Sequence, residues 1–141
     1  MSEIRGVDLP YEWKQRIEQA RYSWSKLKSE TGVGTDDLRR RVPDFGSHYW
    51  TSHHPFVIPE PCTIEPTESY SREEMDEYVD ILSHVAGEAY TNPEVAKSWP
   101  DNSTVSRIDE SGLDDPDTWA ITWRAHCRKV ETDKGSGGER A

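Results

Sequence analysis

The segment that begins at Ser71 constrains the fold most, because it carries both the start signal and the apolar spacing of a long helix. Ser71 and Glu74 have the spacing of a capping box, in which each side chain bonds the backbone N–H of the other residue. Seven apolar residues then recur at three- and four-residue steps: Met75, Tyr78, Val79, Leu82, Val85, Ala86 and Ala89. This period places them on one face of a helix, and Asn92-Pro93 interrupts it. We therefore predict a helix that begins at Ser71, ends before Asn92 and buries one face.

The N-terminal part also shows helical spacing. Six apolar residues recur at similar steps between residues 9 and 27: Leu9, Trp13, Ile17, Ala20, Trp24 and Leu27. This pattern predicts an amphipathic helix over residues 9–27, and its apolar face needs a partner. Thr31-Gly32-Val33-Gly34 interrupts the pattern, and Thr35 is placed to cap a short second helix through Leu38 that ends before Pro43.

Residues 44–66 are aromatic, rich in histidine and interrupted by four prolines. They contain two short strand candidates, residues 54–58 and 62–65, and the prolines leave little room for a central strand. A further strand is predicted over residues 104–108, and residues 119–130 fit either a strand or a helix. The polar, glycine-rich residues 131–141 are expected to be a disordered tail.

The composition limits the partners of this chain. Of its 141 residues, 33% are hydrophobic and 31% are charged, so few positions are available for a core. The six Trp and six Tyr fit either a small aromatic core or a surface that contacts another protein. The net charge of −10 argues against nucleic acid. The basic run at residues 39–41 fits a solvated helix face, or pairing with acidic neighbours or with another subunit. No stretch is apolar enough to cross a bilayer, and Cys62 and Cys127 are expected to be free thiols in the cytoplasm.

Five potential metal ligands lie close together in the sequence: His48, His53, His54, Glu60 and Cys62. Adjacent His53 and His54 would point to opposite faces of a strand, so only one of them can join His48 around one ion. A zinc or iron site also requires ligands at defined spacing on a fixed scaffold. We therefore expect no metal site and rank a metal-dependent enzyme as the weakest functional hypothesis.

Motifs at consistent spacing run from residue 26 to residue 110. The string Leu-Lys-Ser-Glu-Thr-Gly-Val-Gly-Thr-Asp-Asp-Leu-Arg-Arg-Arg occupies residues 27–41, and Asp44-Phe45-Gly46 follows. Ile64-Glu65-Pro66-Thr67-Glu68-Ser69 and Val105-Ser106-Arg107-Ile108-Asp109-Glu110 come later. In this order, the motifs resemble the C-terminal domain of glycine decarboxylase, the P-protein of the glycine cleavage system, and in particular the second subunit of its two-subunit form.

The resemblance implies an α+β fold, the small C-terminal domain of a fold type I pyridoxal-phosphate (PLP) enzyme, with a short mixed sheet and flanking helices. Members of this family hold PLP as a Schiff base on a lysine that follows a histidine near a glycine-rich run. No lysine of this chain stands in such a setting. The resemblance therefore implies a small subunit, inactive alone, that completes the cleft of larger PLP-binding subunits for amino-acid decarboxylation or related α-carbon chemistry. The alternative is a non-catalytic adaptor that keeps the same fold.

The resemblance also suggests functional residues. His48 and Thr51 are expected to face the active-site cleft, and Glu65 and Thr67 to position the strand and turn beneath them. A purely structural role is the alternative for each of these residues, because such side chains also stabilise turns. The chain departs from the family at Asp101, where members have a histidine.

The apolar face near the N-terminus is the predicted docking surface for the larger subunits. It includes Trp13, Ile17 and Trp24, and it precedes the family motifs, which begin at Lys26. We accordingly divide the chain into a docking helix over residues 1–30, a glycine decarboxylase-like domain over residues 31–130 and a tail over residues 131–141.

Overall fold

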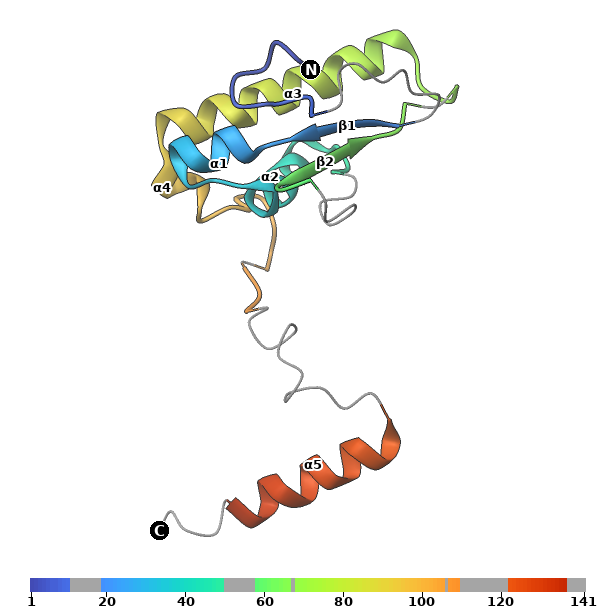
Figure 1. Ribbon diagram of the computed structural model, residues 1–141, viewed down its shortest axis with the longest axis vertical. Coiled ribbons are helices and arrows are strands. Elements are labelled where there is room, and N and C mark those ends of the chain that lie inside the picture. The colour runs from blue at the N-terminus through green and yellow to red at the C-terminus, as the bar shows by residue number, and fades with distance from the viewer. Residues whose placement is uncertain (11–18, 50–57, 67, 106, 110–121, 137–141) are drawn as a thin grey trace. The chain divides into compact units, whose positions relative to one another are not determined.

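The computed structural model describes residues 1–10, 19–49, 58–66, 68–105, 107–109 and 122–136. The chain divides into two compact units, Met1–Arg107 and Ile108–Ala141. The first unit contains a two-stranded antiparallel sheet of β1 (Ala20–Ser23) and β2 (Pro61–Ile64), in which Ala20 lies opposite Ile64. Its described helices are α1 (Ser25–Thr31), α2 (Thr35–Arg41), the 3₁₀ helix η1 (Val42–Phe45), α3 (Arg72–Thr91) and α4 (Pro93–Ala96). The described part of the second unit contains α5 (Trp123–Ser136) (Figure 1).

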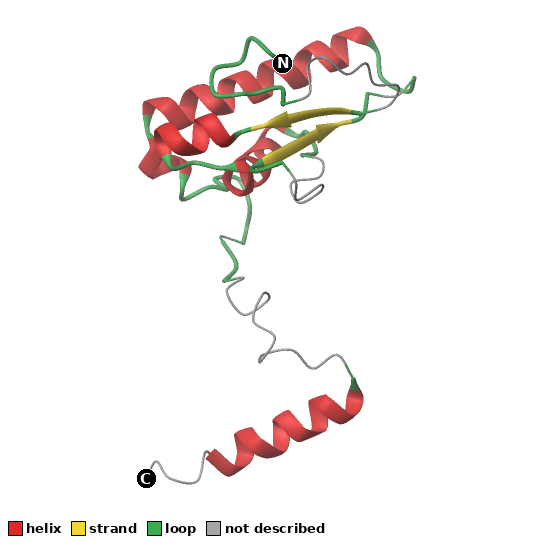
Figure 2. Ribbon diagram, viewed as in Figure 1, coloured by secondary structure: helices red, strands yellow, loops and turns green. Residues whose placement is uncertain are grey.

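The first unit is thus a small mixed α/β domain in which helices outweigh strands (Figure 2). The predicted helix from Ser71 is confirmed as α3. The Ser71 hydroxyl accepts a hydrogen bond from the Glu74 backbone N–H at 3.2 Å, and the Glu74 carboxylate accepts one from the Ser71 N–H at 2.7 Å. The helix packs against α1, α2, η1 and α4, so the core of the unit assembles around it. Its fully buried side chains are Leu82, Val85, Ala86 and Ala89.

The prediction of one helix over residues 9–27 is wrong where the structure describes it, because Ala20–Ser23 form β1. The backbone groups of these residues pair with β2, and this long-range pairing outweighs the local apolar spacing. Trp24 precedes α1, Leu27 lies within it, and both are completely buried. The apolar spacing therefore came from a strand followed by a helix. Trp13 and Ile17 lie outside the described residues.

The other predicted elements had mixed outcomes. The strand over residues 62–65 is confirmed as β2, and the short helix at Thr35 is confirmed as α2, although its N-cap residue is Gly34. Residues 54–57 lie outside the described part, and Ile58 belongs to no strand. Residues 104, 105, 107 and 108 also form no strand, and Ser106 is not described.

The C-terminal unit also differs from expectation. Residues 119–130 were predicted to form either a strand or a helix, and from Trp123 on they form the helix α5, which continues to Ser136. The expected disordered tail is therefore wrong for residues 131–136. The boundary between the two units, after Arg107, lies inside the predicted domain of residues 31–130. No described helix is both long enough and apolar enough to cross a membrane.

A close approach between Gly34 and Glu60 joins the start of α2 to the chain that precedes β2. Glu60 Oε2 accepts a hydrogen bond from the Thr35 backbone N–H at 2.7 Å, which places a negative charge at the positive end of the helix dipole. Glu60 has a φ of 47°, and its C=O accepts a hydrogen bond from the Trp24 N–H at 2.8 Å. A Cβ on Gly34 would overlap this same Glu60 oxygen. A larger residue at position 34 would therefore require the Glu60 carboxylate to move away from the start of α2.

The substitution Gly34→Ala is expected to lower the free energy of unfolding by about 1–3 kcal/mol, because the added methyl group displaces the carboxylate that caps α2. A matched control is Gly87→Ala on the exposed side of α3, where nothing lies within 4 Å of an added Cβ. That change is expected to raise the free energy of unfolding by about 0.5–1 kcal/mol. Urea denaturation followed by circular dichroism measures both values. Equal effects of the two substitutions would contradict the steric argument.

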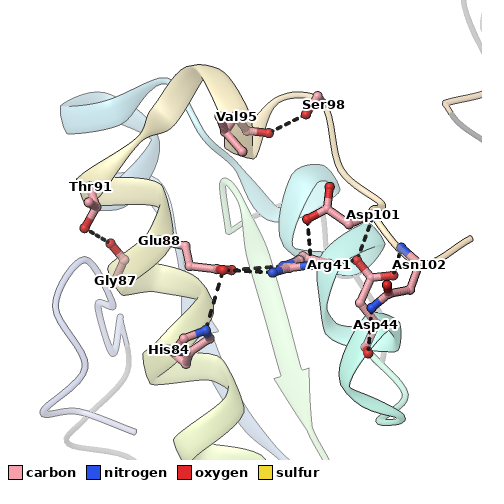
Figure 3. A network of polar contacts seen from close by, with 10 residues as sticks. All are labelled: Arg41, Asp44, His84, Gly87, Glu88, Thr91, Val95, Ser98, Asp101 and Asn102. Atoms are coloured by element: carbon pink, nitrogen blue, oxygen red, sulfur yellow. Dashed lines mark hydrogen bonds and ion pairs between the residues drawn. The ribbon is translucent and has the colours of Figure 1, made fainter.

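Arg41, the last residue of α2, links three parts of the first unit (Figure 3). Its Nη2 and Nε bond the two Glu88 carboxylate oxygens at 2.8 and 2.9 Å. Its Nη1 lies 3.0 Å from Asp44 Oδ2 and 2.9 Å from Asp101 Oδ2. The Asp44 carboxylate also accepts hydrogen bonds from the backbone N–H groups of Asp101 and Asn102. This network joins α2 and η1 to α3 and to the chain after α4, so Arg41 pairs with acidic neighbours of its own chain.

Candidate functional site

A groove of about 720 Å³ lies between the β1–β2 pair, the first turns of α3 and the loop after η1. This volume is in the range of small-molecule sites. Its apolar and aromatic lining residues include Tyr22, Ile64, Tyr70, Met75, Tyr78 and Val79. Two of the four predicted active-site residues, His48 and Glu65, also line it. The groove is therefore our candidate functional site.

His48 reaches the groove from the loop after η1, where it is exposed. Its neighbour Tyr49 is 7% exposed, and the Tyr49 hydroxyl accepts a hydrogen bond from the Trp24 indole N–H at 3.0 Å. The same hydroxyl lies 2.9 Å from the Thr35 hydroxyl, which donates to the Pro61 C=O at 2.9 Å. Because an indole N–H can only donate and a carbonyl can only accept, this chain of bonds has one direction. It ties the backbone beside His48 to the ends of β1 and β2.

The Tyr49 hydroxyl and the neighbouring Cys62 thiol are two buried titratable groups beside this chain of bonds. Burial raises the pKa of the Tyr49 hydroxyl well above its ordinary value, and the neighbouring Cys62 adds to the shift. Burial also raises the pKa of the Cys62 thiol, against the opposing hydrogen bonds of Tyr49 and Trp24. Both groups are therefore neutral at physiological pH, and Cys62 serves the packing of the cluster instead of reacting as a thiolate. Cys62 and Cys127 are free cysteines, as expected.

Glu65 enters the groove immediately after β2 and is half-buried. Its Oε1 accepts a hydrogen bond from the side-chain amide of Gln19, and the Gln19 side-chain oxygen accepts one from Arg21 Nη2 at 3.2 Å. The Arg21 Nε is buried and has no hydrogen-bond partner in the described part of the chain. This chain of bonds fixes the Glu65 carboxylate at the groove wall.

The predicted site residues are therefore only partly brought together. Thr51 and Thr67 lie outside the described residues, so their places at the cleft stay predictions. Trp24 is wrong as a docking residue, because its indole is 0% exposed and belongs to the core of this chain. Trp13 and Ile17 remain untested for the reason given above.

The sequence analysis missed two prominent residues of the groove, Tyr22 and Glu77. Tyr22 fell within the wrongly predicted helix, and Glu77 belongs to no motif that distinguishes it from the other acids of α3. An alternating pattern over Ala20–Ser23, with Tyr22 and Ala20 on the same side of a strand, was the signal that could have placed Tyr22.

The comparison with known families adds to this geometry. The family model described as "Glycine dehydrogenase, C-terminal domain" matches residues 20–106, which extend from the start of β1 almost to the end of the first unit. The chain belongs to this family. The matched part of this glycine dehydrogenase C-terminal domain contains both strands, α1 to α4 and, apart from Met1, every described residue that lines the groove.

Curated relatives of this glycine dehydrogenase domain carry the name "Probable glycine dehydrogenase (decarboxylating) subunit 2". The protein from Pyrococcus horikoshii is 45% identical over 106 residues, which cover 75% of this chain and 21% of the relative. The protein from Thermococcus gammatolerans is 42% identical over 128 residues, which cover 90% and 25%. The protein from Staphylothermus marinus is 34% identical over 131 residues, which cover 92% and 25%. The chain thus spans about a fifth to a quarter of the length of these relatives.

The groove of this glycine dehydrogenase domain does not fit PLP. Its described lining contains no Lys or Arg, whereas it contains the carboxylates of Glu65, Glu74 and Glu77, which would repel a phosphate. Lys26 and Lys28 are exposed on α1 and do not line it. The described residues also gather no group of three potential metal ligands, and Glu60 and Cys62 have the structural roles given above.

Proposed function

We propose that this chain completes the active site of a glycine dehydrogenase (decarboxylating) whose PLP is held by a larger partner polypeptide, in a fold type I arrangement. The observation that carries the proposal is that His48 and Glu65, both inside the family domain, line one groove. The names of the relatives, which specify subunit 2, support an enzyme of more than one subunit. The proposed reaction is decarboxylation of an amino acid, with glycine as the first candidate, or related chemistry at the α-carbon.

In this proposal, the groove faces the partner's active site and excludes water from it. PLP itself supplies the electron sink for α-carbon chemistry. His48 orients the amino-acid carboxylate or moves a proton through its imidazole, a common role of histidine in general acid–base catalysis. Glu65, with Thr51 and Thr67, positions the strand and turn beside it. Trp13 and Ile17 stay candidates for docking to the partner.

A reconstitution experiment tests the proposal. The chain alone is expected to show no visible absorbance of bound PLP and no decarboxylation. The chain together with a PLP-binding polypeptide from the same organism is expected to release CO₂ from an amino acid, while that polypeptide alone does not. Covalent binding of PLP to the isolated chain would contradict the proposal that the partner polypeptide holds the cofactor. A stable complex whose activity is the same with and without the chain would favour an adaptor instead.

The substitution His48→Ala is expected to lower kcat of the assembled enzyme by about tenfold or more, because a positioned proton-transfer group contributes at least that much. The free energy of unfolding is expected to change by less than about 0.5 kcal/mol, because His48 is exposed. Steady-state kinetics and urea denaturation measure the two quantities. An unchanged kcat would show that His48 only packs. The matched control is His84→Ala, on the exposed side of α3 and outside the groove.

A further inference from the structure

Large aromatic and apolar side chains are exposed to solvent in the part of the groove beside α3. Tyr70 is 58% exposed and Met75 is 37% exposed, and both line the groove together with the half-buried Tyr22 and Tyr78. Contiguous apolar surface of this kind marks interaction sites on soluble proteins. Tyrosine and methionine are also enriched where proteins contact one another.

Among the described residues that line the groove, the acidic side chains outnumber the cationic groups, since Met1 with its α-amino group faces three carboxylates. Glu65, Glu74 and Glu77 line it without a Lys or Arg. Glu65 is held by Gln19, and Glu74 caps α3, where the Ser71 backbone N–H lowers the pKa of the Glu74 carboxyl. Glu77 is exposed and has no hydrogen-bond or ion-pair partner in the described part of the chain. The groove therefore presents an excess of negative charge next to aromatic and thioether surface, with three carboxylates against the one α-amino group of Met1.

We propose that this groove receives a basic segment of the PLP-binding polypeptide, with a Lys or Arg opposite Glu77 and an apolar side chain against Tyr70 and Met75. The inference rests on the proposed function and names one surface through which the two polypeptides meet. Charge complementarity selects this occupant, because opposite charges at an interface favour encounter and fix its register. A second copy of this chain fits less well, since each copy has a net charge of −10.

The test measures the dissociation constant between the full chain and the PLP-binding polypeptide that restores activity with it. Glu77→Lys is expected to weaken binding by about tenfold or more, because it places like charges together. Glu77→Gln is expected to weaken it less, and Tyr70→Ser is expected to weaken it through lost apolar contact. Raising NaCl from about 50 to about 300 mM is expected to weaken binding of the native chain more than that of Glu77→Lys.

The matched control is Asp80→Lys. Asp80 is exposed on α3 but does not line the groove, and its substitution makes the same change in net charge. It is expected to change the dissociation constant by less than about twofold, and circular dichroism should show the same fold for both lysine variants. Equal dissociation constants for Glu77→Lys and Asp80→Lys would overturn the inference. The proposed function would still stand in that case if the native chain binds the PLP-binding polypeptide and restores its activity. Failure of the native chain to bind or activate any PLP-binding polypeptide would overturn both. Self-association that Glu77→Lys abolishes would assign the groove to a second copy and overturn the inference as well.

Discussion

Replacing Trp24 by alanine is expected to lower the free energy of unfolding by about 3–5 kcal/mol, the usual cost of emptying a large aromatic site in a core. The indole is completely buried and donates a hydrogen bond to the Tyr49 hydroxyl, which is itself buried. The substitution therefore leaves a cavity and removes the donor at the start of the chain of bonds that leads to Pro61. Urea denaturation followed by far-ultraviolet circular dichroism measures the loss.

Two further variants separate the causes. Trp24→Phe keeps an aromatic ring but no N–H, so it is expected to cost about 1–3 kcal/mol, the penalty of a lost buried hydrogen bond together with imperfect packing. Trp123→Ala removes the same kind of side chain from α5, where the indole is 78% exposed, and is expected to cost less than about 0.5 kcal/mol. A Trp24→Ala protein as stable as the native chain would contradict the role given to Trp24 in the core.

The contrast between α3 and β1 shows which structural features the sequence could predict. The signals for α3 are local, because the Ser71 cap and the apolar period lie within the helix itself. β1 depends on β2, which lies far along the chain, and its residues happen to continue the apolar spacing of α1. Local spacing cannot distinguish a long helix from a strand that leads into a helix. The partner strand decides, and the sequence does not reveal which segment it is.

The candidate site shows the same division. His48 and Glu65 could be named from motif resemblance, but their meeting in one groove follows from the β1–β2 pairing and from the anchoring of Tyr49. Glu77 could not be distinguished by sequence from Asp80, because both are acids on a helix rich in acids. Only the direction of each side chain relative to the sheet separates a groove residue from a solvated one.

The network around Arg41 is a comparable case, since three consecutive arginines have different surroundings. The Arg41 side chain is 12% exposed and bonds Glu88, Asp44 and Asp101. The Arg39 side chain is 30% exposed and pairs with Asp36, which is 53% exposed. The Asp101 carboxylate also belongs to the network around Arg41. The ion pairs of Arg41 and Arg39 differ in how deeply the side chains are buried. The sequence of three arginines does not show this difference.

Arg41→Met is expected to lower the free energy of unfolding by about 3–5 kcal/mol at neutral pH, because it leaves the largely buried Asp44 carboxylate and Glu88 without their cation. Arg41→Lys is expected to cost less, since it keeps the charge but cannot bond Glu88 through two nitrogens. The matched control, Arg39→Met in the same helix, is expected to cost less than about 1 kcal/mol because its ion pair is exposed. Equal losses for Arg39→Met and Arg41→Met would contradict the role given to the network.

The pH dependence of stability provides an independent check on this network. The hydrogen bond from Arg41 lowers the pKa of Glu88. Burial alone would raise the pKa of Asp44, but the Asp101 N–H, Arg41 and the Asn102 N–H together lower it. Groups whose pKa is lowered by folding stabilise the protein fully above their ordinary pKa of about 4, and this stabilisation is lost as the pH falls through the folded-state values. The difference in unfolding free energy between the native chain and Arg41→Met is therefore expected to be largest at neutral pH and to shrink below about pH 4. Urea denaturation at several pH values measures it, and a difference that stays constant down to about pH 3 would mean that Arg41 acts through packing alone.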